Sequence, residues 1–244
     1  MNATDWRLPD APLRASAVTA NLIGLVAVVA LANAARAGLP LGGRYPLKAA
    51  ALFAAIIGLS IGFLQRHHPF ARFGPANQIT TLRAMLVALV AALVGERQTP
   101  GIAAGAVVAS VAVTALDGLD GWLARRHQIA SAFGARFDME IDALLILALS
   151  VLAWRYGKAG AWVVLSGLLR YAFVASGAIA PWLRAALPPS RRRQTICVIQ
   201  IAGLTLAMMP AILPPLSTVL AAVAFVTLTY SFLLDTLWLW RRAA

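Results

Sequence analysis

The chain has 244 residues, of which 61% are hydrophobic and 12% charged, and its mean hydropathy is +0.78. Long apolar runs recur along the whole sequence, which excludes an ordinary soluble domain and indicates a polytopic membrane protein. The formal net charge is +12, but the basic residues lie in short loops between apolar runs. This pattern is typical of the positive-inside bias and of contact with anionic lipid headgroups, so we expect no nucleic-acid partner. The single cysteine, Cys197, excludes an internal disulfide and a cysteine metal site.

The apolar runs predict an all-α bundle of about eight transmembrane helices, each near the length that crosses the hydrocarbon core of a bilayer. Their approximate limits are 15–36, 47–65, 77–95, 101–125, 134–154, 159–182, 195–211 and 215–240. We interpret the first run as a spanning helix and not as a signal peptide, because Asp5 and Asp10 cancel Arg7 and Arg14 and leave no basic start. The seventh run is short because prolines crowd its end.

The distribution of Lys and Arg predicts the orientation of these helices. With eight spans, thirteen of the twenty-one basic residues fall on the side that holds both termini, and six fall on the opposite side. We therefore expect both termini to face the cytoplasm, in the inner membrane of a bacterium.

The acidic residues are strongly clustered. The chain has nine Asp and Glu, and five of them lie between Asp117 and Asp142. If 101–125 and 134–154 are helices, Asp117 and Asp120 share one face of the first, and Asp138 and Asp142 share one face of the second. The turn between the helices is short, so the two faces can meet in an antiparallel pair.

Four carboxylates that converge in apolar surroundings need a cation, because like charges at close range cannot all ionise. Oxygen ligands without Cys or His favour Mg²⁺, Mn²⁺ or Ca²⁺ over zinc. Small residues beside the acids and Arg125 provide the space and the positive charge for a diphosphate. The residues alone leave three hypotheses open: a metal-dependent phosphoryl-transfer enzyme, a cation- or proton-coupled transporter, and a structural ion-pair network.

This stretch resembles the signature of the CDP-alcohol phosphotransferase family. Asp-x2-Asp-Gly-x2-Ala-Arg-x8-Gly-x3-Asp-x3-Asp is present with every spacing kept. Its residues here are Asp117, Asp120, Gly121, Ala124, Arg125, Gly134, Asp138 and Asp142. The segment from Asn77 through Thr80 to Arg83 is similar to the opening helix of the family. The resemblance implies a six-helix core, which we place at 70–244, after a cytoplasmic segment 1–14 and two additional transmembrane helices at 15–69.

The resemblance also implies an activity. Such enzymes transfer the substituted phosphate of a CDP-alcohol, usually CDP-diacylglycerol, to an alcohol and release CMP, as homodimers whose site opens to the cytoplasm. It implies that Mg²⁺ or Mn²⁺ is bound by Asp117, Asp120, Asp138 and Asp142, and that Asp142 is the catalytic base. The residues implied in CDP binding are Asp117, Asp120, Gly121, Arg125, Ser131, Gly134, Asn77 and Thr80. The sequence departs from the common pattern after the third and fourth Asp, where it has Met139 and Ala143.

Basic residues downstream of the signature are candidates for acceptor binding. Arg170 lies inside an apolar run, where an ionisable residue is costly and is usually functional. Arg191, Arg192 and Arg193 begin the seventh run, where their charge opposes the helix dipole and requires an anion nearby. One hypothesis is a pocket for a phosphorylated acceptor such as glycerol 3-phosphate, and the other is a loop in contact with lipid headgroups.

Overall fold

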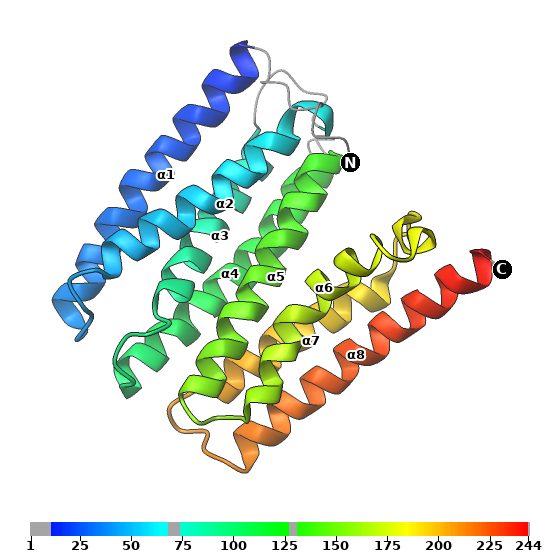
Figure 1. Cartoon of the computed structure of the whole chain (residues 1–244). Coiled ribbons are helices and arrows are strands. Elements are labelled where there is room, and N and C mark those ends of the chain that lie inside the picture. The colour runs from blue at the N-terminus through cyan, green and yellow to red at the C-terminus, as the bar shows by residue number, and fades with distance from the viewer. Residues whose placement is uncertain (1–10, 68–73, 127–130, 244) are drawn as a thin grey trace. The chain divides into compact units, whose positions relative to one another are not determined.

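The residues that the structure describes form an all-α protein. A computed structural model describes the backbone of residues 11–67, 74–126 and 131–243 (Figure 1). The side chains of these residues are described except at Ala11, Pro12, Arg14, 60–67, Ala76, 120–126 and Ala132. The α-helices in these ranges are α1 (Ala11–Gly38), α2 (Tyr45–His67), α3 (Pro75–Ala92), α4 (Pro100–Arg126), α5 (Ala132–Arg155), α6 (Val164–Ser176), α7 (Arg191–Met208) and α8 (Leu216–Ala243). Two short 3₁₀ helices, η2 (Ala161–Val163) and η3 (Pro181–Arg184), flank α6.

The helices belong to two compact units. The first comprises Met1–Arg97 and Val108–Ile141, and the second comprises Gln98–Val107 and Asp142–Ala244. Helices α4 and α5 each contribute one part to the first unit and the other part to the second. The acidic stretch of the sequence lies on these two helices, close to the point where α5 passes from one unit to the next.

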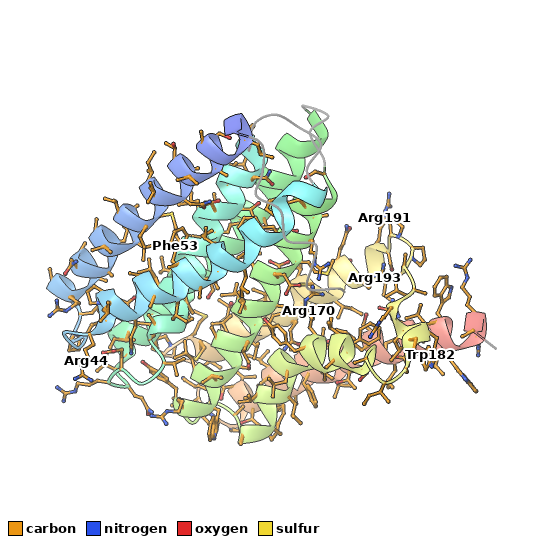
Figure 2. All side chains as sticks on the ribbon, turned by 45° about the horizontal axis from the view of Figure 1, so that its top comes forward. Arg44, Phe53, Arg170, Trp182, Arg191 and Arg193 are labelled. Atoms are coloured by element: carbon orange, nitrogen blue, oxygen red, sulfur yellow. The ribbon has the colours of Figure 1, made fainter. Side chains whose placement is uncertain are left out.

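The first unit is built on contacts among α1, α2 and α3. Phe53 of α2 is 1% exposed, and Figure 2 shows its place among these helices. A Cβ on Gly24 of α1 would lie 2.8 Å from the Phe53 ring and 3.6 Å from the sulfur of Met85 on α3. The absence of a side chain at Gly24 therefore lets the aromatic ring fill the space between the three helices. At the start of α2, the Tyr45 hydroxyl donates to the carbonyl oxygen of Leu89 at 3.0 Å.

An ion pair in the loops ties α2 to the end of α3. Lys48 Nζ lies 2.6 Å from Glu96 Oε1, and the Gly42 N–H donates to Glu96 Oε2 at 2.7 Å. Burial would raise the pKa of Glu96, but the two hydrogen bonds and the positive charges of Lys48 and Arg36 together hold the pKa below its ordinary value. A carboxyl with a lowered pKa adds stability at neutral pH and loses it on acidification, so this contact stabilises the first unit under physiological conditions.

Helix α8 of the second unit has many large apolar residues on its exposed face, as expected of a helix in a bilayer. Its buried face carries small or polar residues, including Ser217, Ala221, Ala224, Ser231 and Asp235. Its exposed face carries Val219, Val223, Val226, Tyr230, Leu233 and Leu237. Large apolar side chains on the exposed face and small residues at the helix contact are typical of a helix surrounded by lipid. At that contact, a Cβ on Gly203 of α7 would lie only 2.9 Å from Cβ of Ala224.

The predicted fold class is confirmed, and one predicted helix is wrong at its end. Three helical segments in the described ranges are long and apolar enough to cross a membrane, Ala15–Gly38, Pro100–Leu119 and Leu216–Ala243, and eight complete spans remain a prediction. The predicted span 159–182 is instead the 13-residue helix α6 between two 3₁₀ turns. The helix cannot run through Pro181, because a proline disfavours helical backbone at the residue before it, and Ala180 has φ −116° and ψ 90°.

In the second unit, a buried lysine just after α5 contacts the α7–α8 loop and the start of α8. Lys158 is 5% exposed, and its Nζ donates to the carbonyl oxygens of Met209 (3.0 Å) and Ile212 (2.5 Å) in the α7–α8 loop. The Lys158 carbonyl in turn accepts the hydroxyl hydrogen bonds of Ser217 (2.7 Å) and Thr218 (3.0 Å) at the start of α8.

We expect Lys158→Met to lower the free energy of unfolding by about 2 to 3 kcal/mol, because it removes the buried charged donor of two hydrogen bonds to the α7–α8 loop. The measurement is unfolding by SDS in mixed detergent micelles. Arg155→Met, three residues earlier and exposed, is the matched control and should be neutral. A Lys158→Met protein as stable as the control would show that these hydrogen bonds make no net contribution to the free energy of unfolding.

Candidate active site

Helices α3, α4 and α5 position the acidic residues of the signature. Asp138 and Asp142 lie one turn apart on α5, so the unbroken helix places both carboxylates on one face. The start of α5 is fixed by Ser131, whose hydroxyl oxygen accepts from the N–H of Gly134 at 3.0 Å, as in a helix N-cap. Asp117 is supplied by α4.

The structure brings three of the four predicted metal ligands together. Asp117, Asp138 and Asp142 each offer a carboxylate oxygen, and these atoms lie within 4.8 Å of one another. Oxygen atoms at this spacing suit a hard divalent cation, so the residues fit the ion that the resemblance implies. The side chain of Asp120, the fourth predicted ligand, lies outside the described residues.

A buried arginine contacts the acidic cluster, and the sequence did not predict this role. Arg83 of α3 is 0% exposed. Its Nη1 lies 2.9 Å from Asp117 Oδ1 and also donates to Asp138 Oδ1. Arg83 was recognised only as part of the opening-helix pattern. The available signal was a basic residue inside an apolar run, the same signal that marked Arg170.

Several residues predicted to bind the nucleotide lie next to the acidic cluster. Asn77 and Thr80 of α3 are buried, at 6% and 3% exposure. A Cβ on Gly134 would lie 3.0 Å from Asn77 Oδ1 and 3.3 Å from the Ser131 hydroxyl oxygen. Asn77, Ser131 and Gly134 therefore converge, and the missing side chain of the glycine lets these two polar groups lie close to the backbone of α5. Gly121 and Arg125 lie in α4, and the side chain of Arg125 falls outside the described part of the chain.

The predicted catalytic base lies against helix α7. The thiol of Cys197 is 3.6 Å from Asp142 Oδ2, within reach of a weak S–H hydrogen bond. Cys197 is four residues after Arg193, so the two share one face of α7. This contact connects Asp142 with the helix that begins at the predicted acceptor-binding arginines.

The arginines at the start of α7 have a partner within the chain. Arg192 Nη2 donates to Asp235 Oδ1 of α8, and Arg193 Nη1 lies 3.3 Å from the same oxygen. Both arginines line a cavity of about 480 Å³, together with Trp238 and Arg241. The anion required at this helix start is thus supplied at least in part by Asp235.

The other two predicted acceptor residues do not line this cavity. Arg191 is exposed, and Figure 2 shows its side chain at the first turn of α7. Arg170 is half-buried on α6. The structure therefore brings Arg192 and Arg193 together, while a shared pocket for all four arginines remains a prediction.

The fold has helices suited to crossing a membrane, and the acidic cluster suits a divalent cation. Comparison with protein-family models then identifies the chain. The model of the CDP-alcohol phosphatidyltransferase family matches residues 73–236, well over half of the chain, so the protein belongs to this family. It is accordingly a transferase of lipid synthesis that uses a CDP-alcohol, and the family depends on a divalent metal. Searches of curated proteins and of solved structures found no match.

We expect Gly134→Ala to raise the KM for the CDP-linked donor several-fold while leaving the protein folded. The added methyl group would stand 3.0 Å from Asn77 Oδ1 and displace this side chain. The measurement is the donor dependence of CMP release in detergent micelles. Gly118→Ala, where a Cβ meets nothing within 4 Å, is the matched control. Equal donor KM values for the two variants would exclude Gly134 from the nucleotide pocket.

Proposed function

We propose that the protein transfers the phosphatidyl group of CDP-diacylglycerol to a small alcohol and releases CMP, with Mg²⁺ or Mn²⁺ as cofactor. The observation that carries this proposal is the convergence of Asp117, Asp138 and Asp142 in a member of the CDP-alcohol phosphatidyltransferase family. A transporter could use the same acids as ion ligands. It would have no need of the phosphate-binding features of the signature, Gly121, Arg125 and Gly134.

In this proposal the acids of the signature have two roles. Asp117, Asp120, Asp138 and Asp142 hold the divalent cation, which when bound supplies positive charge to the diphosphate. Nucleotide binding involves Asp117 and Asp120 together with Asn77, Thr80, Gly121, Arg125, Ser131 and Gly134. Arg125 provides charge-assisted hydrogen bonds to the diphosphate.

Asp142 is proposed to act as the general base. The acceptor hydroxyl oxygen attacks the phosphorus that carries the diacylglycerol, and the bond from that phosphorus to the bridging oxygen of CMP breaks. The proton of the hydroxyl moves to the Asp142 carboxylate, and CMP leaves with the bridging oxygen. The position of Asp142 against Cys197 supports an acceptor that approaches from the side of α7.

We propose that this acceptor carries a phosphate, as glycerol 3-phosphate does, and that Arg170, Arg191, Arg192 and Arg193 bind it. Arg193 precedes Cys197 by one helical turn, which is about 6 Å along α7. That spacing suits a small phosphorylated polyol, with its phosphate at Arg193 and its reactive hydroxyl at Asp142. Arg192 and Arg193 already share Asp235, so the phosphate would join an existing charge network.

The cellular setting is proposed on the same basis. The excess of basic residues on one side of the predicted spans supports a bacterial inner-membrane protein with its active site toward the cytoplasm. A homodimer is proposed from the family resemblance.

We expect Asp142→Asn to reduce turnover by at least about a hundredfold, the usual contribution of a general base, while binding of CDP changes little. CMP release measures the first quantity and calorimetry with CDP the second. Glu140→Gln, two residues away on the same helix, is the matched control and should retain turnover. Normal CMP release by the Asp142→Asn protein would refute the assignment of the base.

We expect Arg193→Gln to raise the KM for a phosphorylated acceptor about tenfold or more, because it removes a charged hydrogen-bond donor. The donor KM should be unchanged. CMP release is measured with glycerol 3-phosphate, inositol phosphate, inositol and serine as acceptors. Arg184→Gln, at an exposed arginine of η3, is the control. A wild-type preference for an acceptor without phosphate would contradict the proposed role of the arginines.

A further inference from the structure

Arg83 of α3 is a basic side chain in direct contact with the acidic cluster. Its side chain is fully buried, with 0% exposure, and Arg83, Asp117 and Asp138 all belong to the first unit. A single guanidinium nitrogen, Nη1, serves two carboxylates: it lies 2.9 Å from Asp117 Oδ1 and donates to Asp138 Oδ1. One positively charged atom therefore bridges an acid of α4 and an acid of α5.

This bridge explains how the acids can stand together before a metal is bound. Two carboxylates that approach without a cation repel each other, and burial increases the cost. A guanidinium is charged at every physiological pH, so Arg83 offsets this repulsion permanently. A buried lysine would be a weaker substitute, because its ammonium is more strongly hydrated than a guanidinium and loses its charge more readily when buried.

The same bridge opposes the cation that the site is proposed to hold. A divalent ion needs lone pairs of Asp117 and Asp138, and Nη1 now hydrogen-bonds to one oxygen of each. The ion would also be placed beside a fixed positive charge. The geometry thus puts Arg83 in competition with the metal for the same two side chains.

We propose that Arg83 is a positioning residue: it acts as the resident counter-ion of Asp117 and Asp138, holds them together in the metal-free protein, and sets the divalent-ion concentration at which the site fills. The inference rests on the proposed metal site. It goes beyond that site by assigning to α3 control over metal affinity. A merely structural ion pair would stabilise the helices and leave metal affinity unchanged.

The test is Mn²⁺ binding to purified full-length protein in detergent micelles, measured from the free Mn²⁺ signal in electron paramagnetic resonance. Arg83→Gln should lower the Mn²⁺ concentration for half-saturation by about tenfold or more, since unit charges about 4 Å apart interact by more than this factor in a protein. Without metal, the variant should melt at a lower temperature than the wild type. Saturating Mn²⁺ should then raise its Tm by more than it raises the wild-type Tm.

Two further variants separate charge from geometry. Arg83→Lys keeps the charge and should bind Mn²⁺ with nearly wild-type half-saturation, while its metal-free Tm still falls. It also serves as the folded variant if Arg83→Gln cannot be purified, and a half-saturation shifted about tenfold in Arg83→Lys would then overturn the competition. Arg155→Gln removes an equal charge about 25 Å further along α5 from Asp138 and should change neither quantity.

The outcomes distinguish this inference from the proposed function. If wild-type protein binds Mn²⁺ and Asp138→Asn abolishes this binding, the metal site stands. An unchanged or raised half-saturation in Arg83→Gln would then overturn the role of Arg83 alone. If the wild-type protein binds no Mn²⁺ that depends on Asp138, the metal site fails and the inference fails with it.

Discussion

The structure depends on one electrostatic constraint, which is that several carboxylates share a small space at the ends of apolar helices. Such a cluster is stable only with compensating positive charge and with a backbone that fixes the positions of the acids. Both requirements are met by secondary structure. Helix α5 fixes Asp138 and Asp142 on one face, and α3 delivers the guanidinium of Arg83 to Asp117 and Asp138. Gly134 then lets Asn77 and Ser131 lie close to the start of α5, where the Ser131 hydroxyl oxygen accepts from the Gly134 N–H.

The surrounding helices follow the rules of a bilayer, where apolar contact between helices gains little over contact with lipid. In α8 most of the buried residues are small or polar, with Leu228 and Leu239 as the exceptions, and many large apolar side chains are exposed, so packing depends largely on close approach and hydrogen bonds. Gly203 against Ala224 and the Lys158 hydrogen bonds are the clearest instances. A helix surface of this kind leaves room for ionic residues such as Asp235 on the buried face, where a partner must be close.

The sequence predicted the class of fold and the central acids because both depend on local periodicity. Hydropathy located the helices, and the four-residue spacing of Asp138 and Asp142 fixed their shared face. Contacts between distant segments were not predictable in this way. The Arg83 bridge joins α3 to α4 and α5, and Arg192 and Arg193 of α7 pair with Asp235 of α8, more than forty positions later in the chain. The end of α6 was missed because apolarity continues past Ser176, whereas the backbone is interrupted ahead of Pro181.

The packing of α1 and α2 gives a physical meaning to helices that precede the matched part of the chain. They contact α3 on the side of Met85 and Leu89, and α3 is also the helix that carries Asn77, Thr80 and Arg83. A slip of α3 by a single residue would move its side chains by about 1.5 Å along the axis and turn them by about 100°. Two contacts oppose such a slip: the packing of Phe53 against Gly24, and the ion pair between Lys48 of α2 and Glu96 just after α3. The leading hairpin thus holds the register of α3, the helix from which Arg83 reaches Asp117 and Asp138.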